Sequence, residues 1–305
     1  MKNDNCLAGK AMKILITGSS GFVGRNVTEY LQAKEKYELV TPSSKELNCI
    51  DEDSVSDFLK KNKFDCIMHF AVYGNAVNKN RNADKILEYN LRIFYNFYNN
   101  RQYFGKMYYT GSGAEYDKKF PIVSVSERQI GEHLPTDQYG LMKYIVGQLI
   151  DKSSNIYNLR LFGIFGKYEY YPQKFISNVC CKAIKGIPLS IRQNVYFDYL
   201  WVEDFCRILE LLINKELNHH TYNIVSGQKI SLKEICKIVN DISGKELPVY
   251  IGKNGFANEY TGNNERFMRE FPNFKYTPTE HAVRELYLWY EENKNNIDMY
   301  NLLYP

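Results

Sequence analysis

The sequence predicts an α/β protein: a doubly wound parallel sheet followed by a smaller C-terminal α/β lobe. Two observations lead to this prediction. Up to residue 163, short apolar runs alternate with helical stretches, a rhythm typical of βαβ units and a parallel sheet. After residue 163 the regular alternation stops. We therefore expect one large sheet domain and a second, smaller lobe.

The expected elements follow in chain order. Strands are predicted at 12–17, 38–40, 65–71, 106–111 and 158–163, and helices at 22–33, 51–62, 83–100 and 137–151. After residue 163 we predict helices at 170–186 and 231–244, strands at 188–191 and 221–227, and a strand that continues into a helix over 197–214. The helix at 231–244 begins with Ser231 and has Glu234 in its first turn, the pattern of a capping box.

Composition excludes several classes of protein. The chain has 305 residues, of which 44% are hydrophobic, and a net charge of +4, so no strongly basic face points to nucleic acid. No apolar run reaches the roughly 18–20 residues of a membrane span, and the first residues lack the apolar core of a secretory signal. The seven cysteines are scattered without a CxxC pair, so we predict reduced thiols, no metal site and a cytoplasmic location.

A glycine-rich turn, TGSSGFVG, follows the first predicted strand and ends at Gly24. Gly18 permits a tight turn, Gly21 lets the backbone approach a pyrophosphate, and Gly24 lets the helix pack closely on the strand. The helix N-terminus offers free N–H groups to phosphates. The pattern predicts a Rossmann-type domain over 12–163, with return segments near 195–225 and a tail at 1–11. The expected cofactor contacts are Gly18, Ser20, Gly21, Phe22, Val23 and Gly24.

The end of the second strand bears on the choice of cofactor. An NAD site usually places an acid there for the ribose diol, whereas NADP requires basic or small polar groups for its 2′-phosphate. The chain reads Ser43-Ser44-Lys45 before the first acid, Glu46. We therefore favour NADPH, bound through Ser43, Ser44 and Lys45, and keep NAD(H) as the alternative.

A second motif, Tyr139-x-x-x-Lys143, lies on the predicted helix at 137–151. Residues four apart share one helix face, so the phenol and the ammonium lie side by side. A nearby ammonium is expected to lower the pKa of the tyrosine. Ser112 ends the strand that precedes this helix, between Gly111 and Gly113. Because strand ends and the glycine turn meet at one edge of a parallel sheet, we expect the three motifs to share one crevice.

Together, TGSSGFVG, HFA at 69–71, GSGAEY, YGLMK and FDYLWVED resemble the extended short-chain dehydrogenase/reductases, in particular the nucleotide-sugar branch and GDP-fucose synthase. The resemblance implies that Tyr139 is the proton donor, that Ser112 binds the sugar C4 oxygen, and that Lys143 lowers the Tyr pKa and holds the nicotinamide ribose. It also implies a cofactor contact at Ala71 and a lobe for the nucleotide sugar at 164–194 and 226–305. A homodimer through the helices at 83–100 and 137–151 is expected.

The departures from the family narrow the chemistry. GDP-fucose synthases epimerise with a Cys two positions after the Ser and a later His, where this chain has Ala114 and, nearest to the His, Lys174. The 4,6-dehydratases carry Asp-Glu after the catalytic hydroxyl, where this chain has Gly113-Ala114. Gly163 stands where the family often has Asn. Both dehydration and built-in epimerisation are therefore disfavoured, and simple reduction remains.

The resemblance also implies a set of substrate contacts, with arginines suited to a diphosphate: Ser112, Gly113, Ala114, Lys174, Phe175, Arg192 and Arg266. His69 is expected to be a hydrogen-bonded core residue. The leading hypothesis is an NADPH-dependent 4-ketoreductase of a nucleotide-linked 4-keto-deoxy-sugar, serving surface polysaccharide synthesis. The alternatives are a 4-epimerase with tightly bound NAD and a non-catalytic dinucleotide-binding regulator.

Overall fold

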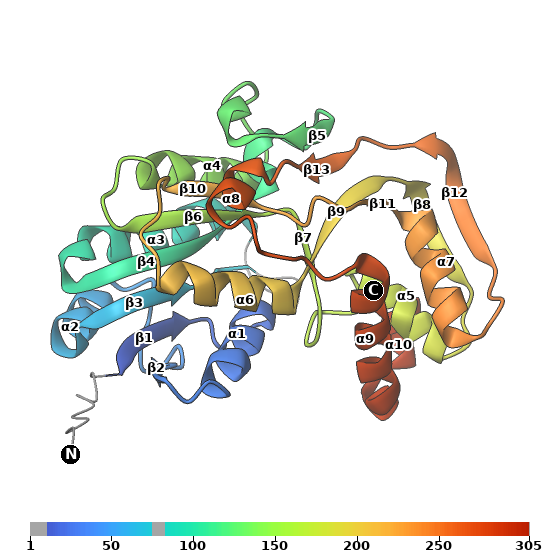
Figure 1. Cartoon of the computed structure of the whole chain (residues 1–305), viewed down its shortest axis with the longest axis horizontal. Helices are drawn as coiled ribbons and strands as arrows, with labels where there is room; N and C mark the ends of the chain where they lie inside the picture. The colour runs from blue at the N-terminus through green and yellow to red at the C-terminus, as the bar shows by residue number, and fades with distance from the viewer. Residues whose placement is uncertain (1–10, 75–82, 305) are drawn as a thin grey trace, which may run out of the picture.

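The apolar runs of the chain form one six-stranded sheet in the computed structural model, which describes residues 11–74 and 83–304 (Figure 1). Every neighbouring pair is parallel, in the order β10-β6-β4-β3-β1-β2. The strands are β1 (Met12–Thr17), β2 (Tyr37–Val40), β3 (Phe64–His69), β4 (Phe104–Ser112), β6 (Ile156–Leu161) and β10 (Thr221–Ile224). The predicted fold class is confirmed, whereas the predicted tail at 1–11 lies almost wholly outside the described residues.

Helices cover both faces of the sheet, which explains why its strands are apolar without alternation. In β1, Ile14 and Ile16 point to one face and Leu15 to the other. The first face is covered by two helices, α1 (Phe22–Gln32) and α6 (Val202–Ile213). The second is covered by three helices: α2 (Glu52–Asn62), α3 (Ile86–Asn99) and α4 (Gln138–Ile150).

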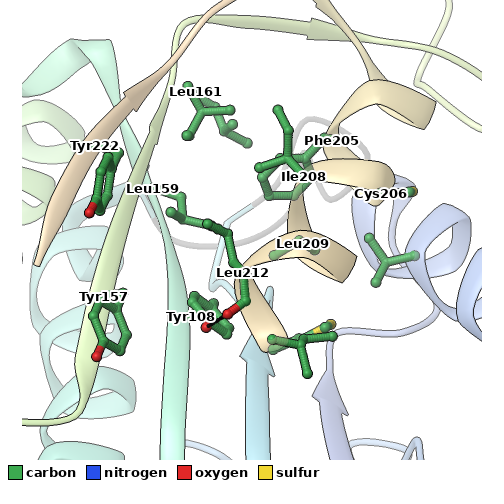
Figure 2. Packing of buried hydrophobic residues seen from close by; sticks show 14 of the residues in the cluster. Tyr108, Tyr157, Leu159, Leu161, Phe205, Cys206, Ile208, Leu209, Leu212 and Tyr222 are labelled. Atoms are coloured by element: carbon green, nitrogen blue, oxygen red, sulfur yellow. Dashed lines mark hydrogen bonds between the residues drawn. The ribbon is translucent and has the colours of Figure 1, made fainter. Parts of the chain in front are cut away.

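Figure 2 shows how α6 packs on the sheet. Phe205, Ile208 and Leu209 of α6 face Leu159 and Leu161 of β6. At the end of the helix, the Tyr108 hydroxyl of β4 donates a hydrogen bond of 2.6 Å to the Leu212 carbonyl oxygen. The phenol thereby gives a second donor to a carbonyl at the helix C-terminus, which also accepts a bond of 3.3 Å from Lys215 N.

The sheet has its topological switch point at β1. The chain passes from β1 to β2 at one edge and then returns to the other side of β1 to form β3. The connections at the ends of β1 and β3 therefore diverge, and a crevice opens between them, where open α/β sheets bind ligands.

The C-terminal lobe contains three helices packed on one another, α5 (Phe175–Ile184), α7 (Leu232–Ser243) and α9 (Thr279–Glu292). Its other elements are α10 (Met299–Leu303), β8 (Leu189–Asn194) and β12 (Val249–Phe256), whereas α8 (Glu265–Glu270) packs in the core of the large domain beside β10. The predicted capping box opens α7: Glu234 N donates to Ser231 Oγ at 3.3 Å, and Ser231 N donates to Glu234 Oε2 at 2.8 Å.

A second sheet, which the sequence did not predict, joins the lobe to the large domain. It has the order β11-β9-β13-β5, and β7 pairs with β9. Its strands are β5 (Ile122–Val125), β7 (Gly163–Phe165), β9 (Tyr196–Trp201), β11 (Lys229–Ser231) and β13 (Tyr260–Gly262). Strand β13 brings Tyr260 of the C-terminal part next to the segment that follows Ser112.

The described part of the chain contains no helix long and apolar enough to cross a bilayer, and no cluster of metal-binding side chains. Six of the seven cysteines lie in it, and all six are free thiols. Cys180 and Cys181 are buried in the packing of α5, as expected for core residues.

Candidate active site

The crevice at the switch point is a single cleft of about 1490 Å³ that reaches from the glycine turn to the C-terminal lobe. One end is lined by the turn after β1 and the other by residues at the start of α5. Between them lie Ser112 at the end of β4 and two side chains of α4, Tyr139 and Lys143. The cleft thus contains all three motifs that the sequence analysis singled out.

The glycine turn is shaped by close backbone contacts. Gly18 has φ +68, and a Cβ there would lie 2.8 Å from Ala71 N at the end of β3. A Cβ at Gly24 would collide with the carbonyl oxygen of Gly18. Gly21 N donates to Gly18 O at 3.0 Å, and α1 begins directly afterwards. The turn therefore presents the helix N-terminus to the cleft, a cradle that fits the pyrophosphate of a dinucleotide.

Every residue predicted around this turn lines the cleft: Gly18, Ser20, Gly21, Phe22, Val23, Gly24 and Ala71. His69 lies behind it in the core, as expected. Its Nδ1 is 3.0 Å from Thr17 Oγ1, and burial lowers its pKa to about 3, with Lys143 acting in the same direction. His69 is therefore neutral.

The end of β2 differs from the prediction. Ser43 and Ser44 line the cleft, but Lys45 does not, whereas Glu46 does. Glu46 Oε2 accepts hydrogen bonds from Ser43 N at 2.8 Å and from Ser43 Oγ at 2.7 Å, and these bonds lower its pKa. The loop folds back on itself, which turns Lys45 away and holds a carboxylate in its place.

Lys143 is held by the strand beneath it. Its Nζ donates to Thr110 O at 2.6 Å and to Tyr109 Oη at 2.9 Å, and it lies 5.8 Å from the Tyr139 ring centroid. Burial lowers the pKa of Lys143 to about 8, and the Glu115 carboxylate opposes this shift. The ammonium is thus fixed at the floor of the cleft.

The prediction of a net lowered pKa for Tyr139 is wrong for this structure. Although 41% of Tyr139 is exposed, desolvation of its phenol raises the pKa; a side-chain interaction with Ser112 opposes the rise, and Glu115 adds to it. The reason is that desolvation outweighs the charge of the Lys143 ammonium, which lies 5.8 Å from the ring and points at Tyr109 and the Thr110 carbonyl. A raised pKa keeps the phenol protonated at neutral pH, which suits a proton donor.

A buried carboxylate lies beneath Ser112. Glu115 Oε1 accepts a hydrogen bond from Ser112 N at 3.0 Å, and Oε2 accepts one from Arg160 Nε at 2.6 Å. Asn158 of β6 donates to the same carboxylate. Both partners of the ion pair are almost fully buried, with 0% exposure for Glu115 and 1% for Arg160. Ser112, Glu115 and the strand β6 therefore form one hydrogen-bonded unit.

Helix α4 packs tightly on this unit through two glycines. A Cβ at Gly147 would lie 2.7 Å from Glu115 Oε2, and a Cβ at Gly140 would lie 2.8 Å from the Ala114 carbonyl oxygen. The helix therefore approaches the segment after Ser112 more closely than any side chain would allow. This approach sets the position of Tyr139 relative to Ser112.

Residues 14–225 match the family model described as NAD dependent epimerase/dehydratase family. The chain belongs to this family. It is 26% identical over 259 residues to GDP-L-colitose synthase of Yersinia pseudotuberculosis, covering 76% of this chain and 82% of that protein. It is also 26% identical over 250 residues to GDP-6-deoxy-D-talose 4-dehydrogenase of Aggregatibacter actinomycetemcomitans, covering 78% and 82%.

Solved structures share the family fold at low identity. A GDP-L-fucose synthetase from Naegleria fowleri bound to NADP superposes with a TM-score of 0.81 at 18% identity, over 93% of this chain and 94% of that one. A GDP-mannoheptose C4 reductase from Campylobacter jejuni with NADP bound gives 0.77 at 18% identity, over 92% and 98%.

Four of the substrate residues implied by the family resemblance lie elsewhere. Lys174 and Phe175 line the cleft, but Gly113, Ala114, Arg192 and Arg266 do not. Gly113 and Ala114 are buried behind Ser112 in the packing against α4 and β13. Arg192 is exposed on β8. Arg266 Nη1 donates to Thr221 O at 2.7 Å and its Nε lies 3.6 Å from Glu127, away from the cleft.

The cleft residues that sequence reasoning missed include Lys118, Glu169 and Tyr199. Glu169 is buried, its Oε2 accepts a hydrogen bond of 2.7 Å from Ser177, and burial raises its pKa to about 7. At Gly163, where the family often has Asn, a Cβ would lie 3.0 Å from the Tyr199 ring. Tyr199 therefore fills the space of that side chain. The Lys118-Lys119 pair after GSGAEY was the only signal in the sequence for the first of these residues.

We predict that breaking the buried ion pair destabilises the fold strongly. Arg160→Met leaves the Glu115 carboxylate buried without its cation, and should lower the free energy of unfolding by about 3–5 kcal/mol. The double variant Glu115→Val with Arg160→Met removes both charges and should be clearly more stable than Arg160→Met alone. Urea denaturation followed by circular dichroism measures both. Equal stability of Arg160→Met and wild type would contradict the assignment.

Proposed function

We propose that this chain reduces the C4 carbonyl of a nucleotide-linked 4-keto-deoxy-sugar with NADPH, to make a precursor of a surface polysaccharide. The observation that carries the proposal is the convergence of Ser112, Tyr139 and Lys143 on the cleft that the glycine turn also lines. The bound nicotinamide supplies the hydride for C4. The named functions of the relatives, which act on GDP-linked sugars, support the same substrate class.

The chain's own residues then act on the substrate oxygen. Ser112 holds the C4 carbonyl oxygen by a hydrogen bond, and Tyr139 gives its proton to that oxygen as it becomes an alcohol. Lys143 remains a cation next to the site and stabilises the phenolate that Tyr139 leaves behind. Since Ala114 is buried outside the cleft, no base stands in the place of the epimerase Cys. Reduction without epimerisation is therefore the supported reaction.

The diphosphate of the substrate is assigned to Lys118 and Lys174, in place of the two arginines. Both line the cleft, and neither makes an ion pair with any described residue. Desolvation lowers the pKa of Lys118; Asp137 opposes this shift, and the charge of Lys174 adds to it. Two lysines that repel one another in a shared cleft favour an anion between them.

A second candidate function is a 4-epimerase with tightly bound NAD, and Glu46 favours it. A carboxylate at the end of β2 suits the ribose diol of NAD and repels a 2′-phosphate. Protein purified with stoichiometric NAD⁺ and no response to added NADPH would support this candidate over the reductase. We also propose a homodimer through α3 and α4, with size-exclusion chromatography and light scattering as its test.

We predict that Tyr139→Phe lowers kcat by about 100-fold or more, because it removes the proton donor and little else. The affinity for NADPH should stay within about twofold of wild type. Turnover is measured as NADPH oxidation with nucleotide-linked 4-keto-6-deoxy-sugars of GDP, CDP, dTDP and UDP, and binding by fluorescence titration. Near-normal turnover of this variant on a substrate of the wild type would overturn the mechanism.

The pH profile of kcat/KM should fall above about pH 8. Lys143 must be protonated to stabilise the phenolate, and burial lowers its pKa to about 8, so activity is present below this pH and lost above it. Lys143→Arg carries a cation that does not titrate in this range, so its remaining activity should lose the alkaline limb. A wild-type profile that stays flat to pH 10 would contradict the role of Lys143.

Lys118→Ala should raise KM for the nucleotide sugar by about tenfold with kcat nearly unchanged, because it removes a charge from the diphosphate. Lys119→Ala is the matched control: Lys119 is exposed like Lys118 but does not line the cleft, and its variant should behave as wild type. Competition with nucleoside diphosphates and monophosphates isolates the phosphate contact. An unchanged preference for the diphosphate in Lys118→Ala would contradict the assignment.

A further inference from the structure

Tyr260 brings a buried hydroxyl to the back of Ser112. It belongs to β13, which pairs with β5 and β9, and its side chain is 8% exposed. Its ring packs on Phe162 and Phe197, with centroid distances of 5.1 and 5.8 Å. Among the described residues its hydroxyl has no partner at hydrogen-bond geometry. A phenylalanine would fill this apolar site equally well, so the hydroxyl itself calls for an explanation.

Gly113 explains how the hydroxyl reaches this place. A Cβ at Gly113 would lie 2.5 Å from Tyr260 Oη and 2.7 Å from Phe162 Cδ1. The glycine directly after Ser112 therefore admits the phenol to the backbone beside the serine. Burial raises the pKa of Tyr260, and a side-chain interaction with Ser112 opposes this rise. The Ser112 side chain acts in the same way on Tyr139, which lines the cleft together with Ser112.

The hydrogen-bonding capacity of Ser112 makes this arrangement directional. A serine hydroxyl accepts two hydrogen bonds and donates one. Ser112 Oγ already accepts one bond, from Ala114 N at 3.1 Å. If Tyr260 donates the second bond, both acceptor positions of Ser112 Oγ are occupied on the side away from the cleft. The only capacity left is the proton of Ser112, on the side of Tyr139 and the cleft.

We propose that Tyr260 is a positioning residue: its hydroxyl donates to Ser112 Oγ and thereby directs the serine proton toward the substrate's C4 carbonyl oxygen. The proposal rests on the reductase function for its catalytic consequence. In the structure the two hydroxyls fall short of hydrogen-bond geometry, so the bond forms when they approach one another. A buried hydroxyl without a partner is costly, which favours that approach.

A double-mutant cycle on Tyr260→Phe and Ser112→Ala tests the proposal. In the wild-type background Tyr260→Phe should lower kcat by about tenfold, the effect of one hydrogen bond of ordinary strength, with KM for NADPH unchanged. In the Ser112→Ala background it should have no further effect, because the acceptor is gone. The probe is the GDP-, CDP-, dTDP- or UDP-linked 4-keto-6-deoxy-sugar on which the wild type shows turnover. An equal loss in both backgrounds, or no loss in either, overturns the proposal.

Tyr276→Phe is the matched control, since Tyr276 also has a buried hydroxyl without a partner but packs on Phe274, away from the cleft. It should leave kcat unchanged. The same cycle read by the urea midpoint needs no substrate: Tyr260→Phe should lower the midpoint of wild type more than that of Ser112→Ala. If the two substitutions shift the urea midpoint additively, the proposed bond is overturned, even when the protein shows no turnover. If the two shifts are coupled but no turnover is found, only the reductase function is contradicted.

Discussion

The arrangement of the candidate active site depends on one buried carboxylate. Glu115 bonds the backbone of Ser112, pairs with Arg160 and receives Asn158, so it ties the end of β4 to β6. Helix α4 lies against the same carboxylate through Gly147. Because the interior is close-packed, these contacts leave little freedom in the distance between the strand and the helix. The serine, the tyrosine and the lysine are placed together by a charge that itself does not reach the cleft.

The same burial that orders the site also sets its protonation states. Desolvation disfavours the charged form of each group, so the pKa of Tyr139 rises while that of Lys143 falls to about 8. Glu115 acts against the shift in Lys143 and with the shift in Tyr139, because its negative charge favours bound protons. The result is a protonated phenol beside a cation at neutral pH, which is the state a reductase needs before it protonates an alkoxide.

Much of the large domain could be predicted from the sequence because its signals are local. An apolar run buried on both faces, followed by a glycine turn and a helix, is sufficient to predict β1, α1 and a cradle at Gly18. The second sheet was missed because β5 and β13 are short and pair over more than one hundred residues. Lys118 was missed for a related reason: whether Lys118 or Lys45 faces a cleft depends on how its loop folds, and the family resemblance favoured Arg192 and Arg266.

The sequence by itself determined the parallel sheet and the glycine turn, since both follow from residue types at fixed local spacing, and its resemblance to a family singled out Ser112, Tyr139 and Lys143. Tertiary structure alone decided which charges enter the cleft, why Glu46 replaces Lys45 at its rim, and which hydroxyl stands behind Ser112. These depend on contacts between segments far apart in the chain, where packing and desolvation decide the outcome. Gly113 illustrates both contributions: the sequence predicts it as a turn residue, and the tertiary structure shows that its missing side chain leaves room for the Tyr260 hydroxyl.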